Sequence, residues 1–137
     1  MFISYFSFEN WQGNRNDLVT KAVENWSDIE TEIRRLNAKT QTLVTLETED
    51  EVHMAIGGGQ GQYVAYVALA DESFHNIIDP SKSEREVNVM VGGQESPYPE
   101  KQCVALETVL QAAKTFAESG QMDKTVVWEE DLALELV

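Results

Sequence analysis

The most constraining feature of the sequence is a change of hydrophobic period near residue 40. Before it, Ile29, Ile33 and Leu36 recur at the spacing of a helix. After it, apolar and polar residues alternate, as in strands with two chemically different faces. Short links that often contain glycine separate these segments, which favours antiparallel pairing because a parallel pair needs a long crossover. The predicted strands are residues 40–48, 51–56, 62–70 and 85–91.

Two helices are predicted, one on each side of this alternating region. Ser27, followed three residues later by Glu30, fits a capping box, and the helix is expected to run to about Asn37. The second helix has apolar residues at helical spacing across residues 106–117. Gly120 is placed to end that helix in the left-handed region.

Strands are also predicted at both ends of the chain, from residues 1–8 and 125–128. Residues 10–17 are turn-rich and indicate a loop, while residues 18–23 fit either a short strand or the approach to a helix. The whole pattern predicts an α+β fold, an antiparallel β-sheet with two α-helices packed against it. The length of 137 residues is that of one domain, so residues 1–137 are expected to form a single domain.

The two glycine-rich stretches do not indicate a phosphate site. A phosphate loop needs amides at a helix start and usually a lysine, whereas residues 57–61 are followed by a strand-like segment without a lysine. We interpret residues 57–61 as a flexible hairpin. Gly92 and Gly93 are interpreted as a turn or bulge, which leads into a loop that contains Pro97 and Pro99.

The residues that commonly carry catalysis or bind metals form no recognisable set. Cys103 is the only cysteine, so no intrachain disulfide can form, and its place beside Val104 before the second helix favours a packed thiol. His53 and His75 lack the spacing of zinc ligands. We therefore predict no catalytic residue, no metal and no cofactor, and a protein that is not an enzyme.

Charge gives the strongest compositional signal. The net charge is −14, and residues 41–100 hold eleven acidic but only two basic residues. Such a field repels nucleic acid and acidic lipid and favours a basic protein partner, although solubility alone would explain it equally well. The chain has neither a signal-peptide pattern nor an apolar run of membrane-spanning length, so a cytoplasmic protein is expected.

The C-terminal half carries an ordered set of short motifs. Residues 89–95 (VMVGGQE) precede the two prolines, a helix ends at residues 116–120 (FAESG), and residues 127–129 (VWE) follow. In this order they resemble the immunity proteins of bacterial polymorphic toxin systems, and most closely their first-numbered family, which includes immunity proteins to nucleic-acid deaminase toxins. One departure is residues 120–123, which read GQMD where this family suggests Gly-x-x-Pro.

The resemblance implies that the protein binds a cognate toxin in the same cytoplasm and blocks its active site. A toxin that acts on nucleic acid carries a basic surface, which an acidic protein can occupy. An acidic protein-binding or assembly domain unrelated to toxins is the alternative. Each candidate contact residue would also be compatible with a solvated surface charge. The candidates are Glu49, Asp50, Glu51, Asp71, Glu72, Glu84, Glu86, Glu129, Glu130 and Asp131.

Overall fold

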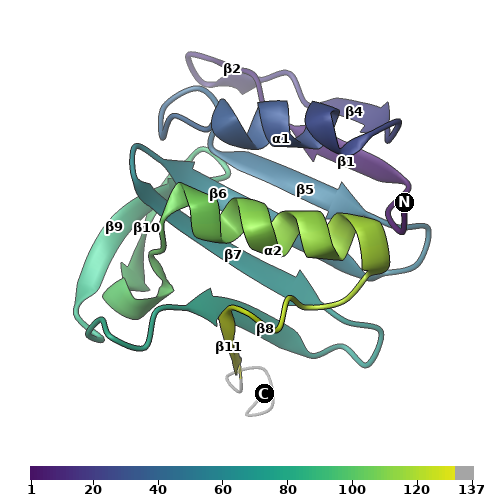
Figure 1. Cartoon of the computed structure of the whole chain (residues 1–137). Helices are drawn as coiled ribbons and strands as arrows, with labels where there is room; N and C mark the ends of the chain where they lie inside the picture. The colour runs from purple at the N-terminus through teal and green to yellow at the C-terminus, as the bar shows by residue number, and fades with distance from the viewer. Residues whose placement is uncertain (132–137) are drawn as a thin grey trace.

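The computed structural model describes residues 1–131 and has an antiparallel β-sheet with helices on one face (Figure 1). Each predicted strand of the alternating region is present, so the predicted α+β fold is confirmed. Residues 18–23 fit either a strand or a helix approach by sequence, and Val19–Ala22 within them form an edge strand. The strands of this sheet within residues 1–131, in spatial order, are β11 (Val127–Glu130), β8 (Phe74–Ile78), β7 (Gln62–Ala68), β6 (His53–Gly59), β5 (Leu43–Glu47), β1 (Tyr5–Phe8) and β4 (Val19–Ala22).

The two helices, α1 (Trp26–Arg34) and α2 (Leu106–Ser119), lie side by side over the same face of the sheet (Figure 1). Their apolar sides are completely buried: Ile29, Val109 and Phe116 have no exposed surface. Burial of each such side chain contributes about 1.5–3 kcal/mol. This layer is the main core, and among the described helices none is long and apolar enough to span a membrane.

The first helix begins and ends differently from the prediction. Asn25 is its N-cap and accepts a hydrogen bond from the Asp28 amide, so the predicted capping box is wrong. Ser27 lies inside the first turn and donates to the Asn25 side chain instead. The helix ends before Asn37, because the Asn37 side chain accepts hydrogen bonds from the amides of the following turn.

The second helix ends as the sequence predicts. Gly120 adopts a φ of +75°, and its amide donates to the Phe116 carbonyl. A Cβ atom at this position would also lie within 2.6 Å of the Phe2 ring. Both the backbone conformation and the close contact therefore require glycine here.

A hairpin of β9 (Glu86–Val91) and β10 (Gln94–Pro99) forms a separate two-stranded sheet, followed by the 3₁₀ turn η1 (Glu100–Gln102). The turn predicted at Gly92 and Gly93 joins its strands. The loop predicted after it is in fact β10, because prolines are tolerated in a strand whose outer edge needs no partner. Likewise, the loop predicted at residues 10–17 contains the short hairpin of β2 (Trp11–Gln12) and β3 (Arg15–Asn16).

The first glycine run lies at the turn of the β6–β7 hairpin, so a hairpin is present where the sequence predicts one. Gly57 and Gly58 lie within β6, and the turn is formed by Gln60 and Gly61, both at positive φ. A Cβ atom on Gly57 would lie 2.7 Å from a methyl group of Val91. This glycine therefore allows β9 to pack closely on the sheet, and β6 extends to Gly59, beyond the end of the predicted strand at residue 56.

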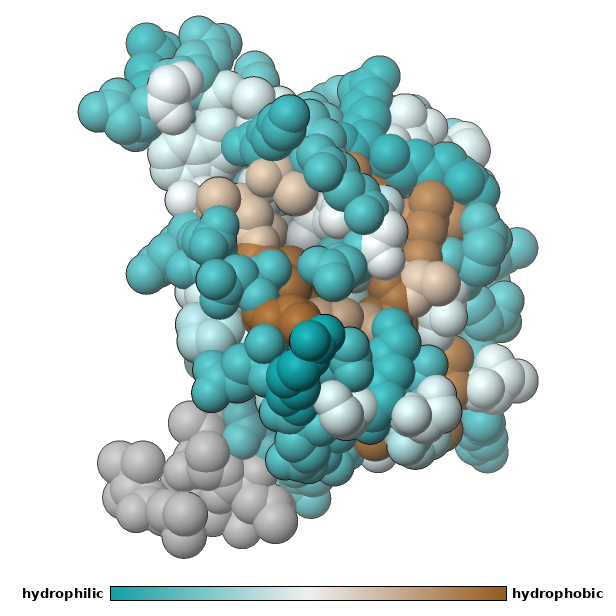
Figure 2. Space-filling model, turned by 90° about the vertical axis from the view of Figure 1, so that its left-hand side faces the viewer, coloured by the Kyte–Doolittle hydropathy of each residue, from teal (hydrophilic) through white to brown (hydrophobic). Residues whose placement is uncertain are grey.

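The second face of the sheet is only partly covered. The β9–β10 hairpin packs there in a small cluster of Val64, Val89 and Cys103, so Cys103 is buried as predicted and burial raises the pKa of its thiol. The strand register leaves the side chains of Tyr66 and Phe74 on the remaining part, which no other segment within residues 1–131 covers and which is called the uncovered part below. Figure 2 shows the side of the molecule where the hairpin lies, with apolar side chains gathered centrally and hydrophilic ones around them.

Candidate functional site

A cleft of about 860 Å³ lies at the end of the sheet where β5 turns into β6 and β7 turns into β8. Its walls come from the loops 48–52 and 69–73, and the last described residues after β11 complete it. The lining residues that the structure describes are Glu47, Thr48, Asp50, Glu51, Val52, His53, Ala68, Leu69, Asp71, Glu72, Ser73, Phe74, Glu130 and Asp131.

Half of these lining residues are acidic, and none of the described ones is a lysine or arginine. The carboxylates come from three segments far apart in the sequence, residues 47–51, 71–72 and 130–131. Like charges held around a concave surface focus the electric field and raise the local concentration of cations. The cleft is therefore suited to a positively charged group.

The loop between β7 and β8 holds its charges in a defined geometry. One carboxylate oxygen of Asp71 accepts hydrogen bonds from the Ser73 amide at 2.9 Å and the Ser73 hydroxyl at 2.5 Å. These bonds lower the pKa of Asp71, with a smaller contribution from His75. The next residue, Glu72, is exposed and has a φ of +68°, a conformation that disfavours side chains other than glycine and asparagine. Asp71 is thus kept ionised, and Glu72 is held in a strained position.

The floor of the cleft is apolar and aromatic. The Phe74 ring lies 5.5 Å from that of Tyr66, which makes an edge contact with the His53 ring at 5.6 Å. The His53 ring nitrogens are within hydrogen-bond distance of the Glu51 carbonyl, at 3.0 Å, and the Tyr66 hydroxyl, at 3.2 Å. Val52 and Leu69 also line the site. An acidic rim above an apolar floor can bind a side chain that has an aliphatic stem and a cationic end.

Most of the acidic residues singled out from the sequence gather in this cleft: Asp50, Glu51, Asp71, Glu72, Glu130 and Asp131. Glu49 belongs to the same loop but does not line the cleft. Sequence reasoning missed Glu47, because it falls inside a predicted strand where no turn signal marks it. Its carboxylate accepts a hydrogen bond from the Ser7 hydroxyl.

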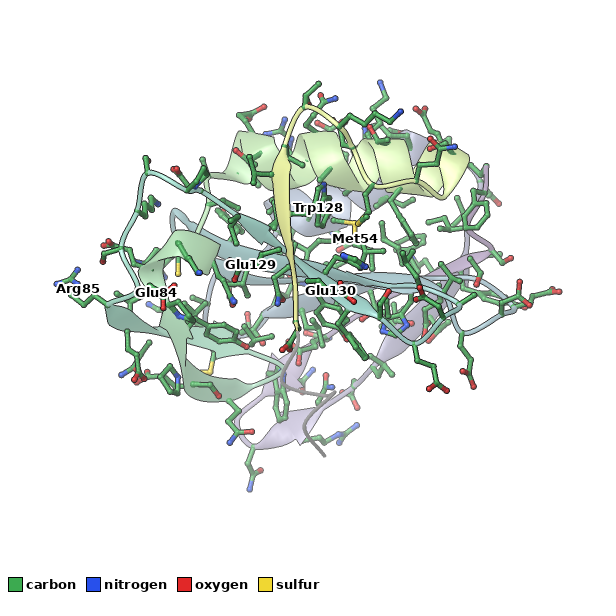
Figure 3. All side chains as sticks on the ribbon, turned by 90° about the horizontal axis from the view of Figure 1, so that it is seen from below. Met54, Glu84, Arg85, Trp128, Glu129 and Glu130 are labelled. Carbon is green, nitrogen blue, oxygen red and sulfur yellow. The ribbon has the colours of Figure 1, made fainter. Side chains whose placement is uncertain are left out.

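The other candidates lie elsewhere. Glu84 and Glu129, labelled in Figure 3, both bind the Lys101 ammonium group, at 2.6 and 3.0 Å. Their hydrogen bonds raise the pKa of Lys101. The two carboxylates therefore join the segment before β9 to β11 through the lysine, and Glu86 is exposed at the start of β9. Contact with a partner remains a prediction for these three residues.

A buried carboxylate that the sequence analysis did not single out fastens the C-terminal strand to α2. Asp123 accepts hydrogen bonds from Thr115, Gln111 and Thr125, which outweigh the effect of burial and hold its pKa well below its usual range. The Asp123 carbonyl accepts a hydrogen bond from the Trp128 indole at 2.9 Å. Trp128, labelled in Figure 3, packs against the main core, and this anchors β11 beside the cleft.

Comparison with known proteins adds one finding. The sequence matches the family model described as Immunity protein Imm1 over residues 20–130. No curated protein matches the sequence. The matched segment contains both helices and every cleft carboxylate except that of Asp131. Among residues 1–131, no group of three or more His, Cys, Asp or Glu side chains is arranged to hold a metal ion.

Proposed function

This chain belongs to the Imm1 family of immunity proteins, and we propose that it neutralises a cognate toxin by binding the toxin's basic surface with the acidic cleft. The toxin is one that acts on nucleic acid. The cleft occupies the surface that would otherwise hold the phosphate backbone, and the protein acts by binding rather than by catalysis.

One observation carries this proposal, the convergence of three acidic segments into one cleft. Residues 47–51, 71–72 and 130–131 are separated in the sequence but line the same concavity. On an acidic protein, chance alone explains a charged surface. It does not explain a hollow that is lined with carboxylates, has an apolar floor and includes no basic residue among those described. Proteins that bind nucleic acid depend on lysine and arginine contacts to phosphate. An acidic cleft therefore complements the active surface of such a toxin.

The chemistry of the cleft also supports fast capture. Opposite charges steer two proteins together and increase association rates, and the remaining contacts then determine how long the complex lasts. Rapid binding matters for a protein that acts in the same cytoplasm as its toxin, because unbound toxin damages its target before dissociation becomes relevant. The same negative field disfavours nucleic acid as a ligand of this chain.

The test is a binding measurement with the cognate toxin domain. The variant Asp71→Lys with Glu72→Lys reverses two charges in the cleft. The matched control, Glu107→Lys with Glu118→Lys, reverses two charges on α2, which covers the other face of the sheet. Both pairs change the net charge equally, so the long-range field changes by a similar amount.

We expect the cleft variant to weaken toxin binding by about 30-fold or more, since opposed charges at a contact cost about 2–5 kcal/mol. The control is expected to change the dissociation constant by less than about threefold. Thermal melts by circular dichroism establish that both variants fold. Equal losses in the two variants would refute the assignment to the cleft, and an unaltered complex in both would refute the electrostatic mechanism.

A further inference from the structure

A second, apolar pocket lies on the uncovered part of the sheet, where the β9–β10 hairpin meets it. It has a volume of about 60 Å³ and is lined chiefly by Leu43, Ala55, Val64, Val91 and Tyr98. This volume lies between the roughly 15 Å³ that one water needs and the roughly 150 Å³ of a cavity that holds benzene. The pocket therefore fits the end of one aliphatic side chain.

The acidic cleft and the apolar pocket each share lining residues with a third hollow. A depression of about 560 Å³ shares Glu130 and Asp131 with the cleft and shares Asn76 and Tyr98 with the apolar pocket. We call these three adjoining hollows the trough, which is acidic at one end, polar in the middle and apolar at the other end.

We propose that this trough binds one extended segment of the toxin, with a lysine or arginine in the acidic cleft and a valine, leucine or isoleucine in the apolar pocket. The inference rests on the proposed function and specifies the chemistry of the partner. Ala68 of β7 lines the cleft and Val64 of the same strand lines the pocket. Four residues of a strand span about 13 Å. The cationic and the aliphatic residue are therefore four positions apart on the toxin segment, where an extended chain presents both on one side.

Charge complementarity selects a basic segment of another protein over a second copy of this chain. Two copies with a net charge of −14 each repel one another, most strongly where their acidic clefts would approach. The pocket itself contains no charged lining residue among those described, and burial raises the pKa of both Tyr66 and Tyr98, so their hydroxyls remain neutral. An aliphatic side chain can enter it without leaving a charge desolvated.

The probe is a blocked heptapeptide in which an arginine and a leucine are separated by three glycine or serine residues, used in both sequence directions. Its control has glycine in place of leucine. Each peptide is titrated into the full chain, and the backbone amide signals are followed by NMR. The arginine of both peptides should shift the amide signals of Asp71 and Ser73. Only the leucine peptide should shift those of Leu43 and Val91. The leucine should strengthen binding about tenfold, because two buried methyl groups contribute about that much.

Two variants of this chain test the pocket in binding measurements with the cognate toxin domain. Ala55→Val fills the pocket, and Tyr98→Ser removes one of its walls, so the two damage it in opposite ways. We expect each to weaken toxin binding about five- to tenfold, mainly through faster dissociation. Thr45→Val is the control, since Thr45 pairs with Ala55 on the neighbouring strand but does not line the pocket.

The outcomes separate this inference from the proposed function. If the charge reversal at Asp71 and Glu72 weakens toxin binding but Ala55→Val and Tyr98→Ser bind normally, the apolar anchor is refuted and the function is retained. If none of these variants weakens the complex, both fail. Concentration-dependent self-association that Tyr98→Ser abolishes would overturn the inference by making a second copy the occupant.

Discussion

Replacing Glu72 by glycine should make the protein more stable and a weaker toxin inhibitor at the same time. Glu72 lies at the tip of the β7–β8 turn with a φ of +68°, and its amide donates to the Leu69 carbonyl at 3.0 Å. The left-handed conformation costs a residue with a Cβ atom about 1–2 kcal/mol. Glycine relieves that cost but adds about 0.5–1 kcal/mol of entropy to the unfolded chain. A net stabilisation of about 0.5–1 kcal/mol is expected, which is about 2–3 °C in melting temperature.

Binding should change in the opposite direction, because the glutamate contributes one of the charges around the cleft. A single charge at a partly exposed contact contributes about 1–2 kcal/mol, so the dissociation constant for the toxin domain should rise about 5- to 30-fold. Glu72→Gln keeps the strained backbone and removes the charge, so it should lose binding without gaining stability. Glu118→Gln removes a charge from α2 and should change neither property.

The assays are chemical denaturation for the free energy of unfolding and surface plasmon resonance for the two rate constants. A glycine variant that is no more stable than Glu72→Gln would show that the turn carries no strain. A glycine variant that is stabilised but binds normally would show that Glu72 makes no contact, and would move the binding site away from this loop.

Three further predictions concern stability and kinetics. The folded-state pKa of Asp123 is depressed, so its contribution to stability is present above the unfolded pKa of about 3.9 and is lost as pH falls below it. Asp123→Asn should therefore be less stable than the native protein at pH 7. Between pH 4 and pH 2, however, the variant should lose less free energy of unfolding than the native protein, as measured by urea unfolding. Parallel losses would contradict the role assigned to the carboxylate. Cys103→Ala should leave toxin binding intact and cost about 1 kcal/mol through a small cavity, and a folded variant that fails to bind would give the thiol a function. The association rate with the toxin domain should fall steeply as salt rises while the dissociation rate changes little, and a salt-independent association rate would exclude steering.

The fold could be predicted wherever one local pattern dominated. The alternating segments and the Gly120 helix end are set by residues close together in sequence, and both are found. The errors occur where distant residues decide. Gly57 is fixed by the approach of Val91, and the proline-containing strand β10 is fixed by its pairing with β9. The residues that neighbour either position in the sequence do not indicate these distant contacts.

The candidate site, like the fold, could be predicted only where local sequence determines it. Six of the acidic candidates line one cleft, since turns at the same end of an antiparallel sheet meet, and their contact with a partner stays a prediction. Sequence alone did not distinguish Glu130, which lines the cleft, from its neighbour Glu129, which binds Lys101. Successive side chains of β11 point to opposite faces of the sheet, and Lys101 of η1 lies on the side of Glu129. These two facts separate Glu129 from Glu130, and both depend on the assembled sheet.

The two faces of the sheet explain how one small domain can be both stable and adapted to a partner. The helices bury the apolar side chains of one face, and Asp123 with Trp128 attaches β11 to that layer, so most of the folding energy lies away from the cleft. Within residues 1–131, the second face is covered by the β9–β10 hairpin alone, and its carboxylates and aromatic rings lie on a rigid support. Binding to a support that is already ordered costs little conformational entropy. We therefore expect substitutions on the uncovered face to change toxin binding at little cost in stability, and substitutions under the helices to lower the stability of the fold.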